Sequence, residues 1–159
     1  MERNGGRKIL ERTPLLVVDV SVGVKWFVKE PLRRKALEVR KDYAEGRTEL
    51  TAPSLLMYEV GNALRFHPVA SPALLVEALA TIDDMQMVES NFSDSDVEAS
   101  SRIAFEEQST FYDATYLALA EKHNCLLLTD DRVLYKKTRK RKHLFQLLDA
   151  YRSSDRQSL

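Results

Sequence analysis

Acidic side chains follow two apolar segments that have the composition of buried strands. Residues 15–18, Leu-Leu-Val-Val, lead directly into Asp19, and residues 125–129, Cys-Leu-Leu-Leu-Thr, lead into Asp130 and Asp131. Such runs leave no polar face, which is typical of strands that are covered on both sides in a parallel sheet. Because ligands bind beyond the carboxyl ends of parallel strands, we expect these carboxylates to meet at one functional edge.

Two further acids lie in helical patterns where a charge is costly. Glu59 has Leu55 and Ala63 one turn away on either side, and Asp113 is followed by the apolar run Ala-Thr-Tyr-Leu-Ala-Leu-Ala. Asp and Glu are rarely buried unless they are paired or bind a metal. Both residues are therefore candidates for the same site.

Each acid also has a structural interpretation. Asp19, Asp130 and Asp131 could cap the helical patterns that follow them. Asp113 could face the positive end of a helix dipole, and Glu59 could pair with an arginine. Taken one by one, these interpretations are the more common ones. Four such acids together, two of them at the ends of strands, favour a functional cluster.

A cluster of four carboxylates has a definite chemical requirement. Two such charges about 4 Å apart repel by roughly 1 kcal/mol in water and by about 4 kcal/mol near a protein surface. The cluster therefore needs protons or a cation, and a set of oxygen ligands without His or Cys suits Mg²⁺ or Mn²⁺. These ions bind phosphate oxygens and activate water, so the pattern favours phosphodiester hydrolysis.

The rest of the chain alternates between strand and helix patterns. Besides the two strands that end in acids, we expect strands over 49–52, 86–89 and 144–148, and helices over 22–29, 32–45, 55–66, 73–85, 93–107, 111–122 and from 132. Alternation of this kind predicts an α/β domain with a mostly parallel, five-stranded sheet flanked by helices.

Four segments resemble, in order and spacing, the motifs of the PIN-domain ribonucleases. They are Val-Val-Asp19-Val-Ser21, Glu59-Val-Gly-Asn62-Ala-Leu, Tyr112-Asp113-Ala-Thr-Tyr-Leu-Ala-Leu-Ala and Leu-Leu-Thr129-Asp-Asp131. The third motif is the most specific of the four. The likeness extends from about residue 15 to residue 148, and the small single domain is similar to VapC-type toxins of toxin–antitoxin pairs.

The resemblance implies a role for each of these positions. In that family the first, third and fourth acids bind Mg²⁺ or Mn²⁺, and they correspond to Asp19, Asp113 and Asp131. Glu59 would complete the site as a ligand or a base, and the threonine-x-aspartate pattern selects Asp131 rather than Asp130. The side chains that would support the acids are Ser21, Asn62 and Thr129. The resemblance also implies the strand order 3-2-1-4-5, a homodimer and an antitoxin partner.

The charge of the chain is balanced overall but not locally. Lys and Arg together number 24, as do Asp and Glu, so no net field attracts nucleic acid or membrane. One basic run begins five residues after Asp131 and contains Lys136, Lys137, Arg139 and Lys140. These residues could bind RNA phosphates near the site. The alternative, a solvated surface helix, is slightly favoured for such a run.

Length and composition predict a single domain in a reducing compartment. We expect a PIN-like nuclease domain over 14–150, with a flexible lead over 1–13 and a flexible tail over 151–159. We expect no signal peptide, because no apolar core follows the first charged residues, and the sequence contains no apolar run long enough to span a membrane. A single cysteine, Cys125, cannot form an internal disulfide. A cytoplasmic protein without a membrane partner is the resulting prediction.

The sequence thus predicts a Mg²⁺- or Mn²⁺-dependent ribonuclease, acting as a toxin that its antitoxin restrains. One alternative is a PIN nuclease of RNA processing. A phosphotransferase or phosphatase with Asp19 as nucleophile is weaker, because Ser21 stands where such enzymes usually supply a second acid. A receiver or protein-interaction module, in which the acids merely bind a cation, would need a lysine after a late strand, and the sequence has no clear one.

Overall fold

The centre of the protein is a parallel sheet of five strands. The computed structural model describes residues 12–153. The strands are β1 (Leu15–Val18), β2 (Glu49–Pro53), β3 (Val88–Glu89), β4 (Leu126–Thr129) and β5 (Phe145–Leu147). They lie in the order β3-β2-β1-β4-β5, and every neighbouring pair is parallel. The predicted fold class and strand order are therefore confirmed.

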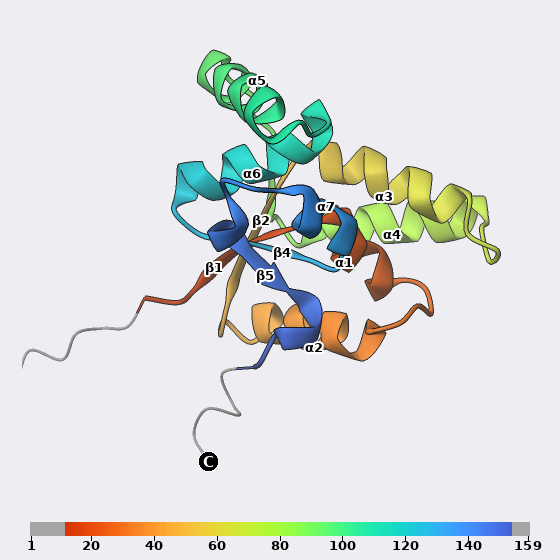
Figure 1. Ribbon diagram of the computed structural model, residues 1–159. Coiled ribbons are helices and arrows are strands. Elements are labelled where there is room, and N and C mark those ends of the chain that lie inside the picture. Colours follow the sequence, from red (N-terminus) through yellow and green to blue (C-terminus); the bar gives the residue numbers. More distant parts are fainter. Residues whose placement is uncertain (1–11, 154–159) are drawn as a thin grey trace, which may run out of the picture.

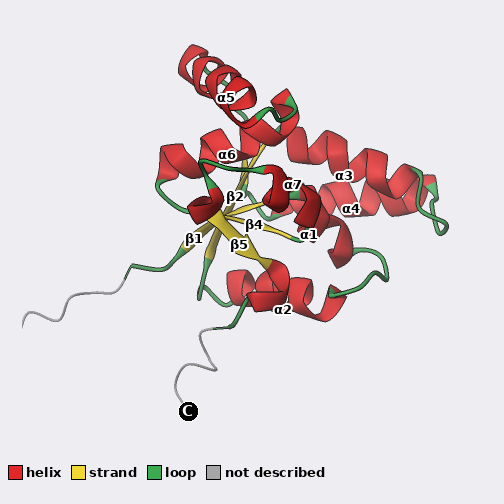
Figure 2. Ribbon diagram, in the orientation of Figure 1, coloured by secondary structure: helices red, strands yellow, loops and turns green. Residues whose placement is uncertain are grey.

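Helices cover the sheet and project beyond it (Figure 1). They are α1 (Val20–Gly23), α2 (Arg33–Ala44), α3 (Leu55–Arg65), α4 (Pro72–Asp84), α5 (Asp94–Glu107), α6 (Phe111–His123) and α7 (Arg132–Lys137). Short 3₁₀ turns occupy Val24–Trp26, Lys142–Leu144 and Leu148–Ala150. Figure 2 shows α2 on one side of the sheet and α5 and α6 on the other.

Two predicted elements differ from those observed by more than one residue at an end. The helix expected over 22–29 is α1 followed by a 3₁₀ turn, and it starts directly after Asp19 and ends at Trp26. The strand expected over 86–89 is reduced to Val88 and Glu89, because Gln86 has a positive φ of 54° that breaks an extended conformation. The basic helix stops at Lys137, and the rest of the basic run is a loop.

The two strands that end in acids form the middle of the sheet. Val17 and Val18 on β1 and Leu127 and Leu128 on β4 are completely buried, as their apolar pattern predicts. Val18 lies opposite Leu128, and the backbone N–H of Asp19 donates to the Leu128 carbonyl at 3.1 Å. This bond extends the ladder by one residue beyond β1. The ladder therefore fixes the backbone of Asp19 at the carboxyl edge.

Helix α6 links the sheet to the outer helix α5. It contacts β1, β2 and β4 on one side and α5 on the other. All seven residues from Ala114 to Ala120 are buried, as expected for a helix that is enclosed by its neighbours. The helix begins where the Thr110 hydroxyl accepts from the Asp113 backbone N–H at 3.1 Å. Asp113 therefore stands in the first turn of a tightly held helix.

The packed domain continues past residue 150. Tyr151 and Ser153 are buried, and their hydroxyls donate to the two carboxylate oxygens of Asp42 at 2.7 and 2.8 Å. Asp42 is itself buried and also accepts from Arg47. The predicted boundary at 150 is therefore too early, because the start of the expected tail is anchored on α2. Residues 1–11 and 154–159, which make up most of the expected lead and tail, lie outside the described residues.

Within residues 12–153, the longest helices are too short or too polar to cross a membrane.

Replacing Tyr151 with phenylalanine removes one hydrogen bond from the buried carboxylate of Asp42. Burial raises the pKa of Asp42, but the bonds from Tyr151, Ser153 and Arg47 together lower it below its ordinary value. We expect Tyr151→Phe to lower the free energy of unfolding at neutral pH by about 1–3 kcal/mol. The loss should shrink as the pH falls through the lowered pKa of the folded state, because a protonated carboxyl no longer needs the bond.

Urea denaturation at about pH 7 and about pH 3 measures both effects. Tyr58→Phe is the matched control, since Tyr58 is 77% exposed. Equal stability of Tyr151→Phe and the wild type at neutral pH would show that the segment after residue 150 is not anchored in this way.

Candidate active site

The four predicted acids come from four elements and approach one another at the carboxyl edge of the sheet. Asp19 follows β1, Asp131 follows β4, Glu59 lies in the middle of α3, and Asp113 lies in the first turn of α6. Asp19 and Asp113 are close enough to Glu59 to raise its pKa, and Asp131 is close enough to Asp19 to do the same. We call these four residues the acidic cluster.

Asp19 is the most enclosed member of the acidic cluster. Its side chain is 6% exposed, and its Oδ2 accepts from the Ser21 hydroxyl at 2.6 Å and from the Thr129 hydroxyl at 2.7 Å. Burial raises the pKa of Asp19, and the charge of Asp131 adds to the effect, while the two hydroxyl bonds offset part of it. The carboxylate is therefore oriented by two hydroxyls but is short of positive charge.

The hydroxyl of Thr129 fixes the turn that carries Asp131. While donating to Asp19, it accepts from the Asp131 backbone N–H at 2.9 Å. The Ser21 hydroxyl likewise fixes Asp130, because it accepts from the Asp130 backbone N–H at 2.8 Å. Asp131 Oδ1 in turn caps α7 by accepting from the Leu134 N–H at 2.8 Å. Asp131 thus does cap the helix that follows it, as its alternative interpretation proposes, and the cap uses one oxygen of its carboxylate.

A buried lysine distinguishes Asp130 from Asp131. Lys25 is 5% exposed, and its Nζ lies 3.2 Å from Asp130 Oδ2 and 3.2 Å from Glu30 Oε2. Asp130 is therefore neutralised by a partner, which supports Asp131 as the member of the cluster. Sequence reasoning did not identify Lys25, although a lysine within Val-Gly-Val-Lys-Trp-Phe-Val was a signal for a buried ion pair.

Glu59 has the least satisfied carboxylate of the cluster. Its Oε1 is buried without a hydrogen bond, and so is the hydroxyl of Tyr116, which lies beside it. Burial raises the pKa of Glu59, the Tyr116 hydroxyl beside it offsets part of the rise, and the charges of Asp19 and Asp113 raise it further. The pKa of Tyr116 is also raised, by burial and then by the neighbouring acids, so its hydroxyl stays protonated. Tyr116 is a second residue at the site to which sequence reasoning gave no role.

Asp113 is the member of the cluster that is already paired with a cation. Its Oδ2 lies 3.4 Å from Lys137 Nζ, and its side chain is 28% exposed. Lys137 belongs to the predicted RNA-binding run, so this residue reaches the acids directly. Asn62 is exposed one turn after Glu59, and within residues 12–153 its side chain makes no hydrogen bond to the acids.

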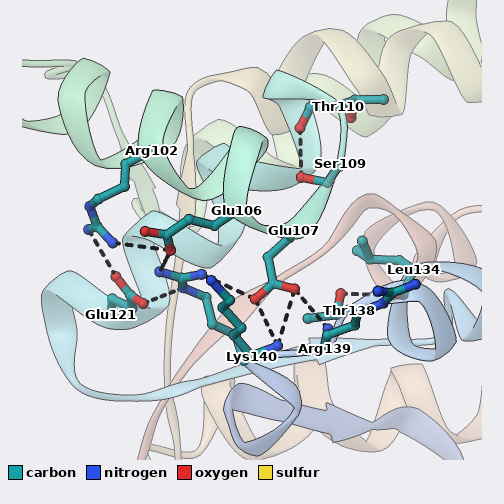
Figure 3. Close-up of polar contacts among 11 residues, drawn as sticks. Arg102, Glu106, Glu107, Ser109, Thr110, Glu121, Leu134, Thr138, Arg139 and Lys140 are labelled. Carbon is teal, nitrogen blue, oxygen red and sulfur yellow. Dashed lines mark hydrogen bonds and ion pairs between the residues drawn. The ribbon is translucent and has the colours of Figure 1, made fainter.

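The second half of the basic run is held by a buried glutamate (Figure 3). The Glu107 carboxylate accepts from the backbone N–H groups of Arg139 and Lys140 at 2.7 and 3.1 Å. Arg141 is buried and forms ion pairs with Glu107, Glu106 and Glu121. The side chains of Lys136, Arg139 and Lys140 remain exposed. The run is thus a helix end and an anchored loop, and not the uniform solvated helix of the alternative interpretation.

The residues of the cluster fit a divalent cation in their chemistry. All the ligands would be carboxylate oxygens, Glu59 Oε1 is buried without a partner, and burial and like charge raise the pKa values of Asp19 and Glu59. Within residues 12–153, however, no three His, Cys, Asp or Glu side chains lie close enough to hold an ion as they stand. Binding would require the carboxylates to turn toward one another.

Comparisons with known proteins agree with this arrangement. The family described as PIN domain matches residues 16–140, a range that contains the whole acidic cluster. Among solved structures, the crystal structure of PAE2754 from Pyrobaculum aerophilum is similar, with 27% sequence identity and a TM-score of 0.60. The similarity covers 86% of this chain and 91% of that one. None of the curated proteins matches the chain significantly.

Replacing Glu59 with glutamine should stabilise the protein when no divalent metal is present. An amide keeps the shape of the side chain, removes a half-buried charge and can donate to the neighbouring carboxylates. We expect Glu59→Gln to raise the free energy of unfolding in EDTA at neutral pH by about 1 kcal/mol. The gain should vanish below about pH 4, because the wild-type carboxyl is then protonated in both the folded and the unfolded state.

Urea denaturation at both pH values tests this expectation. Glu77→Gln is the matched control, since Glu77 is exposed on α4. If Glu59→Gln were less stable than the wild type in EDTA, the interpretation of Glu59 as an unsatisfied charge would be wrong.

Proposed function

Because the chain belongs to the PIN domain family, whose members are generally metal-dependent nucleases, we propose that it hydrolyses RNA with the help of Mg²⁺ or Mn²⁺. The observation that carries this proposal is the acidic cluster: four carboxylates from β1, α3, α6 and the end of β4 converge at one edge. Placing four acids together costs folding free energy. A cation bound by these carboxylates would offset this cost and would also bind a phosphate of the RNA.

Asp19, Asp113 and Asp131 are the proposed metal ligands. Ser21 and Thr129 hold the Asp19 carboxylate in a fixed orientation through their hydroxyls. A bound divalent ion would neutralise charge on the phosphate and lower the pKa of the water that it coordinates. The turn after β4, which the Thr129 hydroxyl fixes, presents Asp131 to the same edge.

Glu59 is proposed as a further ligand or as the residue that accepts a proton. Its raised pKa brings it closer to neutral pH than an ordinary carboxyl, which suits a proton acceptor. Tyr116 beside it retains its proton and can donate a hydrogen bond to Glu59 once the two side chains turn toward each other. Tyr116 thus acts through Glu59, as a positioning residue.

Exposed cations on either side of Lys137, which itself contacts Asp113, support RNA as the substrate. Lys136, Arg139 and Lys140 are exposed, and the backbone of the last two is held by Glu107, so their position is defined. Such cations bind phosphates without reading sequence. A single strand or a loop is the expected form of the RNA, because its backbone is accessible to the carboxylates.

In the cell, we propose that the protein is the toxin of a VapBC-type pair. Its single small domain and the order of its motifs support this assignment. The proposal includes a cytoplasmic location, a homodimer and an antitoxin that binds the protein and blocks cleavage. A role in RNA processing remains the second candidate, and co-expression with the protein encoded next to it tests the choice between them.

Cleavage of a labelled, unstructured RNA tests the proposed activity. We expect the wild type to cleave in Mn²⁺ or Mg²⁺ and not in EDTA, and we expect Asp113→Asn to reduce the rate at least a hundred-fold by removing a proposed ligand. Asp113→Asn should fold, because it loses only a partly exposed ion pair with Lys137.

The matched control for this assay is Asp84→Asn, which changes an exposed acid at the end of α4. It should cleave like the wild type. Folded wild-type protein that cleaves none of several unstructured RNAs in either metal would count against the proposal and favour a module that only binds.

Asp130 and Asp131, the two adjacent acids after β4, should differ in how much their replacement slows cleavage. Asp131→Asn keeps a side chain that caps α7 well, so its effect reports the lost charge and not a lost cap. We expect it to reduce cleavage at least ten-fold more than Asp130→Asn does, since Asp130 is already paired with Lys25. Measured kcat/KM values for both variants decide the assignment, and a larger loss in Asp130→Asn would reverse it.

A further inference from the structure

A pocket opens at the same edge of the sheet as the acidic cluster. It encloses about 230 Å³ between the ends of β2 and β3 and the helices α3, α5 and α6. Its walls are mostly apolar and include four aromatic rings, those of Tyr58, Phe92, Phe111 and Tyr112. We call it the aromatic pocket. Its volume lies below the range of about 300–1,000 Å³ that is typical of drug-sized ligands, so it suits one small flat group.

The strand order places the aromatic pocket directly beside the acids. The pocket is lined by Pro53 at the end of β2 and by Asn91 after β3. Asp19 and Asp131 follow β1 and β4, which are the next two strands along the sheet. Helix α7, with its exposed cations, follows β4. An RNA backbone that crosses the acids from these cations would therefore bring its next nucleotide to the pocket.

Two exposed tyrosines of the pocket directly precede members of the acidic cluster in the sequence. Tyr58 precedes Glu59 on α3 and is 77% exposed, and Tyr112 precedes Asp113 on α6 and is 61% exposed. Phe92 and Phe111 form an edge-to-face pair with their ring centres 6.3 Å apart. Exposed aromatic rings are the surfaces on which proteins stack the bases of single-stranded RNA.

A buried hydroxyl in the pocket lacks a partner. Ser100 lines the pocket with its side chain completely buried, so its hydroxyl lies just behind the pocket surface and a ligand reaches it only when the neighbouring side chains move. Its Oγ makes no hydrogen bond, and an unpaired buried hydroxyl is costly unless a ligand satisfies it. A hydroxyl can both donate and accept, which matches the polar edge of a nucleobase.

The charges around the pocket favour a base over a phosphate. None of its lining residues is a lysine, arginine or histidine. Its two acids, Glu89 and Asp96, are already paired, Glu89 with His123 and Asp96 with Lys122. Without a free cation the pocket has nothing to bind a phosphate, whereas its rings and its hydroxyl suit a neutral, flat group.

We propose that the aromatic pocket binds one unpaired nucleobase of the RNA, adjacent to the phosphate that is cleaved. The inference rests on the proposed nuclease function and adds to it the residues that select and position the substrate. Tyr112 and Tyr58 provide exposed stacking surfaces, and Ser100 forms a hydrogen bond with the edge of the base once the side chains that cover its hydroxyl move.

Binding of a labelled, unstructured RNA in EDTA tests the proposal, together with copies of that RNA in which one nucleotide at a time is abasic. For the wild type, one abasic position at a fixed distance from the cleaved bond should weaken binding roughly ten- to a hundred-fold. Tyr112→Ala should weaken binding of the intact RNA by a similar factor and should no longer respond to that abasic position. Ser100→Ala should weaken binding several-fold and leave the melting temperature unchanged or raised.

Phe105→Ala is the matched control, because Phe105 is an aromatic residue on α5 that is 87% exposed and lies outside the pocket. It should bind the intact RNA as the wild type does and should respond to the same abasic position. If Tyr112→Ala also binds the intact RNA and responds to the abasic position like the wild type, the pocket does not bind a base, even though the wild type still cleaves RNA.

Sedimentation of the same variants separates a protein interface from a base site. Tyr112→Ala that keeps RNA binding but no longer self-associates, or no longer binds a protein partner, would overturn the proposal. Wild-type protein that neither binds nor cleaves RNA in Mn²⁺ would refute the proposed function itself, and with it the proposal.

Discussion

The burial of one carboxylate, that of Asp19, constrains the rest of the site. Its backbone completes the ladder between β1 and β4, and its side chain accepts hydroxyl bonds from Ser21 and Thr129. These same hydroxyls accept backbone N–H groups from the turn after β4, so one network joins both central strands. A buried charge that receives only neutral donors remains partly uncompensated, which is why the pKa of Asp19 is raised.

The neighbouring acids divide into those that the protein compensates and those that it does not. Lys25 neutralises Asp130, and Lys137 reaches Asp113. Glu59 has a buried oxygen with no partner, and its pKa is raised by burial and by two other acids. A structure under selection for stability alone would pair or remove such a group. Its retention agrees with a site that a cation completes, and Lys137 offsets part of the negative charge of the cluster at Asp113.

The sequence predicts the sheet and its acids well because both depend on local patterns. A run such as Leu-Leu-Val-Val before Asp19 defines a buried strand and its end, and the strand order followed from the resemblance. The sequence does not predict which residues become partners when they lie far apart along the chain. Lys25 meets Asp130 and Arg141 meets Glu107 only after folding, and no local pattern indicates which acid each cation pairs with. The anchoring of Tyr151 on Asp42 was missed for the same reason, since the two lie 109 residues apart.

The most direct test of the central claim is whether a divalent cation stabilises the protein through the acidic cluster. The measurement is the melting temperature of the wild type and of Asp113→Asn, titrated with Mn²⁺ from an EDTA-treated start. An ion that binds only the folded state must raise the melting temperature, and we predict a rise of several degrees for the wild type, largely lost in Asp113→Asn. No rise in the wild type, or an equal rise in both proteins, would contradict the assignment of the acidic cluster as a metal site.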